Sequence, residues 1–216
     1  MIELDPTLAP WPFHAEDEIE AATSVLQSGR VNYRTGTEGQ SFEAEYAAAT
    51  RSKHALTVAN GTAALELALA ALEIGPGDEV VVPARTFIAT ASAVVRCGAT
   101  PVVSDIDTVS QNLNSETLSA VLSDRTRAVI PVHLAGWPAD MDEILAVAKT
   151  YGLAVIEDCA QAHGALYKGQ PVGTIGDIGC FSFCQDKIIS TGGEGGLVLT
   201  NNTSLYKRMW SLRDHG

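Results

Sequence analysis

Polar side chains that could bind a ligand or take part in catalysis follow successive apolar runs in this 216-residue sequence. In chain order they are Asn60-Gly61-Thr62, Thr86-Phe87, His133, Asp158 and Lys187. If the runs are strands of a parallel sheet, their carboxyl ends share one edge, and ligands bind outside that edge. Few ligands need an amide-lined turn, an aromatic ring, a carboxylate and a lysine together, and pyridoxal phosphate is one of them.

The lysine is the residue that such a cofactor needs most. Lys187 lies between an apolar run at 178–183 and a glycine-rich stretch at 191–196. A lysine that forms a Schiff base must be desolvated, so that its amine is neutral enough to attack an aldehyde. Taken alone, Lys187 would be interpreted by default as a solvated surface lysine. Lys168, in a polar hairpin turn, is interpreted in that way.

A carboxylate and an aromatic ring could serve the cofactor's heterocycle. Glu157 and Asp158 end an apolar run, and alternation along a strand predicts that they point to opposite faces. A carboxylate at Asp158 could keep a pyridine nitrogen protonated, which makes the ring an electron sink. Phe87 could stack on a flat ring. The simpler alternatives are a strand-end acid that caps the loop at 159–164 and a core phenylalanine.

The phosphate could be held without a basic residue. Thr62 is placed to cap a helix predicted over 62–73, whose first free amides and dipole would favour an anion. Ser182, between two phenylalanines of an alternating run, could add a hydroxyl donor. The alternatives are a plain strand-to-helix turn and a serine bonded to its own backbone.

The elements that would position these residues alternate along the chain. Helical patterns lie at 62–73, 86–97, 115–122 and 141–151, and apolar runs lie at 54–58, 79–82, 100–104, 128–132, 154–157, 178–183 and 197–200. This alternation predicts an α/β fold with a mainly parallel sheet and helices on both faces. The last two runs are joined by a glycine-rich loop, which allows one of them to run antiparallel. Further helices are predicted over 15–28, 41–51 and 203–214.

Composition excludes several function classes. The formal net charge is -12, from 26 acidic and 14 basic residues, so we expect no nucleic-acid partner. The four cysteines form no CxxC pair, which favours reduced thiols and no metal site. No apolar stretch is long enough to span a bilayer, and residues 1–5 do not resemble a signal peptide. We therefore expect a cytoplasmic protein without a membrane partner.

Several stretches together resemble the DegT/DnrJ/StrS family of sugar aminotransferases, from about residue 10 to the end. They are residues 60–65 (NGTAAL), 75–80 (GPGDEV), 98–102 (GATPV), 156–162 (IEDCAQA), 181–183 (FSF) with Lys187, and 193–196 (GEGG). The resemblance implies the large domain of a fold type I enzyme that uses pyridoxal 5'-phosphate. It also implies roles for individual residues: Lys187 as the Schiff-base lysine and proton-transfer base, Asp158 as partner of the pyridine nitrogen, Gln161 beside the phenolic oxygen, Phe87 stacked on the ring, and Thr62, Ala63 and Ser182 as phosphate ligands.

The implied reaction moves an amino group from L-glutamate to a nucleotide-linked keto-sugar, in a homodimer with the site at the interface. Residues 1–216 would comprise an N-terminal segment and the large domain. The family's smaller C-terminal domain would lie outside this sequence, together with a phosphate ligand from the partner and some sugar contacts. His215-Gly216 follows the last predicted helix without a closing element, so we expect the sequence to stop inside a larger protein.

Two alternatives remain beside this interpretation, and a third, a nicotinamide dehydrogenase, is set aside. A sugar dehydratase would keep the cofactor, but relatives of that kind have histidine where Lys187 stands. A regulatory protein would bind the cofactor without catalysis. A nicotinamide dehydrogenase would need GxGxxG after the first parallel strand, where residues 60–62 read Asn-Gly-Thr. The sequence does not specify the sugar, its nucleotide or the carbon that is aminated.

Overall fold

The computed structural model describes residues 11–215 and divides the chain into two compact units. The first unit ends at Phe42 and the second begins at Glu43. Residues 1–5, on which the expectation about a signal peptide rests, lie outside the described residues. No helix in the described range 11–215 is both long enough and apolar enough to cross a membrane.

The first unit contains helix α1, Glu16–Ser28, close to its predicted range. The Ala15 amide donates to Glu18 Oε2 at 2.7 Å, which satisfies one free amide at the start of the helix. Gly29 ends it in the left-handed conformation, with φ of 69°. Helix α2, Glu38–Thr50, begins three residues before its predicted start and continues into the second unit.

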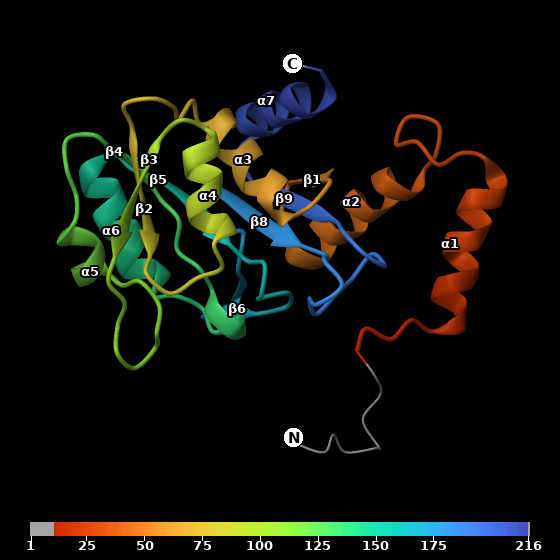
Figure 1. Ribbon diagram of the computed structural model, residues 1–216, viewed down its shortest axis with the longest axis horizontal. Helices are drawn as coiled ribbons and strands as arrows, with labels where there is room; N and C mark the ends of the chain where they lie inside the picture. Colours follow the sequence, from red (N-terminus) through yellow and green to blue (C-terminus); the bar gives the residue numbers. More distant parts are fainter. Residues whose placement is uncertain (1–10, 216) are drawn as a thin grey trace. The chain divides into compact units, whose positions relative to one another are not determined.

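The second unit is built on a seven-stranded sheet in the order β1-β9-β8-β5-β4-β2-β3 (Figure 1). The strands are β1 His54–Val58, β2 Glu79–Pro83, β3 Thr100–Ser104, β4 Thr126–Val129, β5 Ala154–Asp158, β8 Ile178–Ser182 and β9 Gly196–Thr200. Strands β3, β2, β4, β5 and β8 pair in parallel, while β9 is antiparallel to both of its neighbours. The predicted α/β fold with one antiparallel strand at the glycine-rich loop is confirmed.

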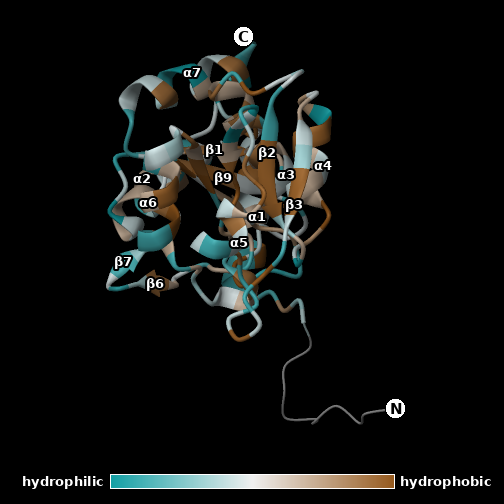
Figure 2. Ribbon diagram, turned by 90° about the vertical axis from the view of Figure 1, so that its left-hand side faces the viewer, coloured by the Kyte–Doolittle hydropathy of each residue, from teal (hydrophilic) through white to brown (hydrophobic). Residues whose placement is uncertain are grey.

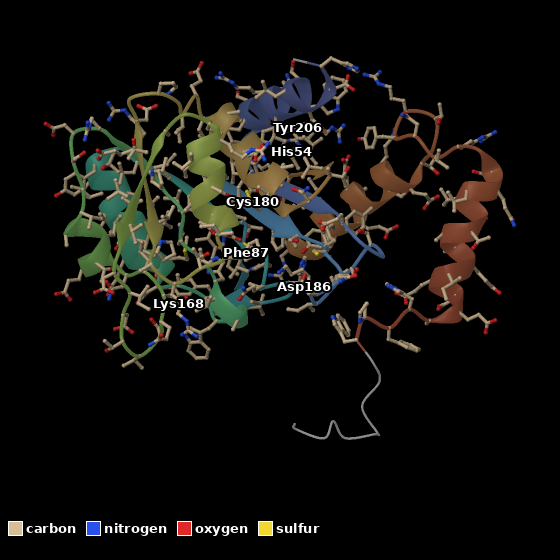
Figure 3. All side chains as sticks on the ribbon, in the orientation of Figure 1. His54, Phe87, Lys168, Cys180, Asp186 and Tyr206 are labelled. Carbon is tan, nitrogen blue, oxygen red and sulfur yellow. The ribbon has the colours of Figure 1, made fainter. Side chains whose placement is uncertain are left out.

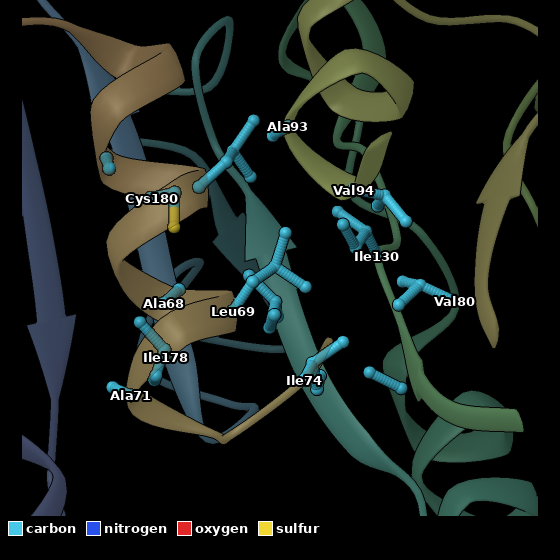
Figure 4. Packing of buried hydrophobic residues seen from close by; sticks show 14 of the residues in the cluster. Ala68, Leu69, Ala71, Ile74, Val80, Ala93, Val94, Ile130, Ile178 and Cys180 are labelled. Carbon is cyan, nitrogen blue, oxygen red and sulfur yellow. The ribbon is translucent and has the colours of Figure 1, made fainter. Parts of the chain in front are cut away.

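Helices cover both faces of this sheet. One face packs against α3 (Gly61–Ala71), α4 (Ala89–Arg96) and α7 (Thr203–Asp214), in a core cluster that includes Leu69 and Ile178 (Figure 4). The other face packs against α5 (Ser115–Ser119) and α6 (Met141–Tyr151). Figure 2 shows the consequence: the middle residues of β9 and β2 are hydrophobic, whereas α7 has hydrophilic positions. Burial on both faces is what parallel strands require.

Several element boundaries differ from the sequence prediction. Strand β4 ends at Val129 rather than 132, because Pro131 has no amide to donate, and only a single bridge from Val132 to Asp158 continues the pairing. Helix α4 begins at Ala89 rather than 86. The predicted polar hairpin turn at Lys168 is present, and it joins the two-residue strands β6 (Leu166–Tyr167) and β7 (Gln170–Pro171), for which no ranges were predicted.

Candidate functional site

A cavity of about 500 Å³ opens at the carboxyl edge of the parallel strands. Six of the seven residues predicted for the site line it: Thr62, Phe87, Asp158, Gln161, Ser182 and Lys187. The seventh, Ala63, is not among its lining residues. The structure thus brings together side chains that are up to 125 residues apart in sequence, 187 minus 62, from the turn after β1 to the loop after β8.

Two glycines bring the turn after β1 against the end of β8. A Cβ atom at Gly196 would lie 2.3 Å from the Asn60 carbonyl oxygen, and a Cβ at Gly61 would lie 2.7 Å from the Ser182 Cβ. Both distances are too short for any side chain. Glycine is therefore required at both positions to let the start of α3 approach Ser182 closely.

The start of α3 differs in detail from the prediction. The N-cap is Asn60, not Thr62, because Asn60 Oδ1 accepts from the Ala63 amide at 2.9 Å. The Ala63 amide, which the family resemblance assigns to the phosphate, is therefore already engaged. The amides of Gly61 and Thr62 are the first two of the helix and have no acceptor among the described residues. They could hold an anion at this helix end.

Asp158 is the buried carboxylate of the cavity, with 6% of its surface exposed. Thr90 Oγ1 donates to Asp158 Oδ2 at 2.8 Å, and the Ala160 amide donates to Oδ1 at 3.1 Å. Burial raises the pKa of the Asp158 carboxyl, while these two hydrogen bonds and the charge of Lys187 partly oppose the rise. The Thr90 hydroxyl lies 2.7 Å from the Thr86 hydroxyl, which can donate to it. Asp158 thus keeps acceptor capacity on the cavity side.

The neighbouring carboxylate, Glu157, faces away from the cavity and is fully buried. Its two oxygens accept from four donors at 2.7–3.0 Å: the amides of Gly173, Ile175 and Gly176 and the ring nitrogen Nε2 of His133. The predicted alternation of Glu157 and Asp158 is therefore confirmed. Glu157 is a structural anchor with its acceptor sites filled.

Glu157 also belongs to a group that could suggest a metal site, since potential ligand atoms of His133, Glu157 and Cys159 all lie within 4.8 Å of one another. The hydrogen bonds argue against it. His133 Nδ1 accepts from the Ala139 amide at 3.1 Å, so Nε2 carries the proton that is given to Glu157. Burial raises the pKa of the Cys159 thiol far above its usual range, which disfavours the thiolate that a metal needs.

Lys187 lies on the loop from β8 to β9, with 17% of its side chain exposed. Its amide donates to the Cys184 carbonyl at 2.9 Å, and its Nζ lies 3.2 Å from Asp186 Oδ2. Asp186 is largely exposed, so this ion pair is weak and can be exchanged for another partner of the ammonium. Thr191 Oγ1 donates to the Glu194 carbonyl at 2.7 Å and ties the loop back on itself.

Gln161 and Phe87 form two further walls of the cavity. The Ala135 amide donates to Gln161 Oε1 at 2.8 Å, from a residue held at a positive φ of 51°. This bond fixes the side-chain amide and leaves its Nε2 as a donor. Phe87 is 65% exposed, so its ring is not a core side chain. Figure 3 shows Phe87 in the same region as Cys180 and Asp186, which also line the cavity.

Several residues of this site were not found from the sequence. Thr90 could have been found, because it lies four residues after Thr86, which is one turn of the helix predicted over 86–97. Cys184, Gln185 and Glu194 line the cavity beside Lys187, but no motif singles them out. Their placement follows from the path of the loop between β8 and β9.

The donor set fits pyridoxal phosphate. Two free amides and the Ser182 hydroxyl lie at one side of the cavity, and a buried carboxylate and a lysine line the same space. A phosphate needs donors, a pyridinium nitrogen needs a carboxylate, and an aldehyde needs an amine. The described residues that line the cavity include no cation other than Lys187, so the phosphate would be bound here by neutral donors.

Comparison with known proteins gives consistent relatives. A UDP-N-acetyl-3-dehydro-α-D-glucosamine 3-aminotransferase of Acidithiobacillus ferrooxidans is 52% identical over the whole chain, which corresponds to 57% of that protein. The crystal structure of an aminotransferase from Psychrobacter cryohalolentis is 56% identical and superposes with a TM-score of 0.95, over 96% of this chain and 53% of that one. The chain thus spans little more than half the length of these relatives.

A third relative bears on the cofactor. A protein described as a sugar aminotransferase from Streptococcus pneumoniae, solved in a PLP form and a PMP form, is 34% identical. It superposes with a TM-score of 0.88, over 96% of this chain and 58% of that one. The model of the DegT/DnrJ/EryC1/StrS aminotransferase family matches residues 12–216. With nearly the whole chain matched, this protein belongs to the DegT/DnrJ/EryC1/StrS aminotransferase family.

Proposed function

We propose that the protein transfers an amino group from L-glutamate to a keto-sugar attached to a nucleotide, with pyridoxal 5'-phosphate in the cavity described above. The observation that carries this proposal is the joint placement of Lys187 and Asp158 in one cavity with a phosphate-compatible helix start. The overall exchange is balanced: glutamate becomes 2-oxoglutarate as the sugar ketone becomes an amine.

The cofactor, when bound, supplies an electron sink for the carbon that loses a proton. Asp158 would hold the proton on the pyridine nitrogen, since its carboxylate is buried and keeps acceptor capacity. Lys187 Nζ would take the proton from the carbon of glutamate that bears the amino group and return it to the aldehyde-derived carbon of the cofactor. The amides of Gly61 and Thr62 and the Ser182 hydroxyl would bind the phosphate, and Phe87 would stack on the ring.

The substrate class is supported by the relative from Acidithiobacillus ferrooxidans, whose name specifies a nucleotide-linked 3-keto-sugar. The identity of residue 187 supports amino transfer over dehydration. A lysine can act as both Schiff-base partner and base, whereas the dehydratases that the chain resembles have histidine at that position. The proposal therefore specifies the reaction by residue 187 and the substrate class by the relative.

The first test is absorbance and covalent trapping. The full-length protein purified with pyridoxal phosphate should absorb in the visible range, and borohydride should leave an adduct on Lys187 that peptide mass spectrometry locates. Lys187→Ala should lose the adduct. Lys168→Ala is the matched control, because Lys168 lies in an exposed hairpin turn outside the cavity. An adduct that persists in Lys187→Ala would overturn the assignment.

The second test separates the alternatives. Adding L-glutamate should convert the bound cofactor to pyridoxamine phosphate, and a panel of nucleotide-linked keto-sugars should then give an aminosugar with one of them. A deoxysugar product would favour dehydration. Cofactor binding without any reaction with glutamate would favour a regulatory protein.

We further propose a cytoplasmic homodimer, and a second domain beyond the large domain. The homodimer and the second domain rest on family membership, and the cytoplasmic location rests on the cysteine pattern of the sequence. Light scattering on the full-length protein should give twice the chain mass, and a monomer with full activity would contradict a site that needs its partner.

A further inference from the structure

Strand β8 continues beyond the end of its neighbour β5. The register pairs Asp158, the last residue of β5, with Cys180, and the Cys159 amide donates to the Cys180 carbonyl. Ser182 lies two residues farther along β8, where β5 offers no partner. Its carbonyl accepts instead from the ring nitrogen Nε2 of His163 at 2.8 Å. An imidazole thus replaces the missing strand.

The second ring nitrogen of His163 is also hydrogen-bonded. The Tyr46 hydroxyl lies 2.8 Å from His163 Nδ1. Because Nε2 must carry a proton to donate to the Ser182 carbonyl, Nδ1 is the acceptor of the Tyr46 hydroxyl. Both side chains are buried, and the rings of Phe181 and Phe183 lie 5.0–5.7 Å from theirs. Burial lowers the pKa of His163 and raises that of Tyr46, so both stay neutral.

The two bonds of His163 join three separate parts of the chain. Tyr46 belongs to α2, His163 to the loop after β5, and Ser182 to the end of β8. That loop also carries Gln161, whose side chain lines the cavity. Neither Tyr46 nor His163 lines the cavity. They can therefore influence a ligand only through the residues that they hold.

We propose that His163, oriented by Tyr46, is a positioning residue that holds Ser182 so that its hydroxyl meets the cofactor phosphate. This inference rests on the proposed function. The Ser182 hydroxyl accepts from the Cys184 amide at 3.4 Å, so its own proton is available to a phosphate oxygen. The contact with Gly61 fixes Ser182 from the α3 side, and His163 fixes its backbone from the other side.

The test compares ligands with and without the phosphate, in the full-length protein. Dissociation constants of pyridoxal phosphate and of pyridoxal are measured by absorbance for wild type, His163→Leu and His163→Gln, with the thermal midpoint of each cofactor-free protein. We expect His163→Leu to weaken pyridoxal phosphate binding about tenfold, because the Ser182 carbonyl loses its donor. The dissociation constant of pyridoxal should change less than about twofold, because pyridoxal has no phosphate group for the Ser182 hydroxyl to contact.

Two further comparisons make the mechanism specific. Glutamine can present a donor where His163 Nε2 stands, so His163→Gln should restore most of the affinity, whereas the shorter His163→Asn should not. In a Ser182→Ala background, His163→Leu should have no additional effect, since the hydroxyl through which it acts is gone. His54→Leu is the matched control. Its Nε2 also makes a hydrogen bond, with Thr203 Oγ1 at 2.9 Å, and its ring stacks on Tyr206 (Figure 3). His54 is the first residue of β1, at the end of the strand away from the cavity.

The outcomes separate this inference from the proposed function. Equal loss of both ligands in His163→Leu, or additive effects with Ser182→Ala, would overturn the positioning role and leave the proposed function intact. A wild-type protein that binds neither ligand would overturn both. If His163→Leu does not fold, the contrast between the glutamine and asparagine substitutions at His163 decides in its place, and equal affinity of these two would contradict the inference.

Discussion

The two sides of the end of β5 present adjacent carboxylates with opposite hydrogen-bonding states. On the closed side, Glu157 accepts from four donors at 2.7–3.0 Å. On the cavity side, Asp158 accepts from two donors at 2.8 and 3.1 Å. Both side chains are buried, so exposure does not distinguish them. The number of filled acceptor sites distinguishes them: Glu157 stabilises the fold, whereas Asp158 is available to a ligand.

The surroundings of the two carboxylates differ in the same way. The loop that donates to Glu157 is packed so closely that a Cβ at Gly176 would lie 2.7 Å from the Val155 carbonyl oxygen, and one at Gly173 would lie 2.6 Å from the Phe181 ring. No ligand could enter there. Asp158 instead faces a cavity of about 500 Å³. Substitutions on the two sides should therefore separate stability from function.

The largest effect is expected on the cavity side. Asp158→Asn should reduce turnover about 10³-fold, because a neutral amide cannot hold the charge of a pyridinium. Stability should not fall. Burial raises the pKa of Asp158 above its value in the unfolded chain, so the ionised carboxylate destabilises the cofactor-free fold as the pH rises toward the folded pKa. Asparagine carries no such cost.

The measurement is the thermal midpoint of cofactor-free Asp158→Asn at neutral pH, beside its turnover number. We expect a midpoint equal to or above that of the wild type. A lower midpoint with little loss of turnover would reverse the roles given to the two carboxylates.

The next effect is expected on the closed side. Glu157→Gln should reduce the free energy of unfolding by about 3 kcal/mol, because one end of the glutamine side chain would present N–H groups to the donors that Glu157 now accepts. The fraction that folds should retain its turnover. Chemical denaturation measures the first and kinetics per folded protein the second.

The matched control is Glu73→Gln, the same substitution at an exposed carboxylate that pairs with Arg208. Its effect should be much smaller than that of Glu157→Gln, because an exposed ion pair contributes little to stability. A similar loss for Glu157→Gln and Glu73→Gln would show that the four donors contribute little to stability.

A smaller effect is expected at Thr90, whose hydroxyl donates to Asp158. Thr90→Val keeps the shape but removes a bond that lowers the pKa of Asp158, so that pKa should rise further. Turnover should fall about tenfold, as for one lost hydrogen bond to a charge. The acid limb of cofactor binding should move to higher pH, since protonated Asp158 cannot pair with a pyridinium. Thr90→Ser, which keeps the hydroxyl, should leave the limb in place.

Much of this fold could be predicted from the sequence, because the signals are local. The alternation of β-branched runs and helical periodicity gave the order and type of every element of the main sheet. The hairpin turn at Lys168 was predicted, but the ranges of β6 and β7 could not be, since two-residue strands have no periodicity. The end of β4 was misplaced because Pro131 looks apolar in a hydrophobic run but cannot donate a hydrogen bond.

The site was predictable where a residue lies at the carboxyl end of a strand, as Asp158 and Ser182 do. It was not predictable where one side chain acts on another. Asn60 was missed as the helix cap because Thr62 and Asn60 are both good caps and only the backbone path distinguishes them. Tyr46 and His163 were missed because they are 117 residues apart and meet only in the folded chain.

On the closed side, we expect metal ions to have no effect on the stability of the protein. Zinc would need free lone pairs on His133, Glu157 and Cys159. In the structure both ring nitrogens of His133 are engaged, Glu157 is filled, and burial keeps the Cys159 thiol protonated by raising its pKa. Zinc should therefore neither remain with the protein after dialysis nor raise its thermal midpoint. The Cys159→Ala variant should give the same two results as the wild type. The wild type could instead retain one zinc per chain, and Cys159→Ala could abolish that retention. This result would show that a cation can replace the hydrogen bonds around Glu157, and it would contradict the contrast drawn with Asp158.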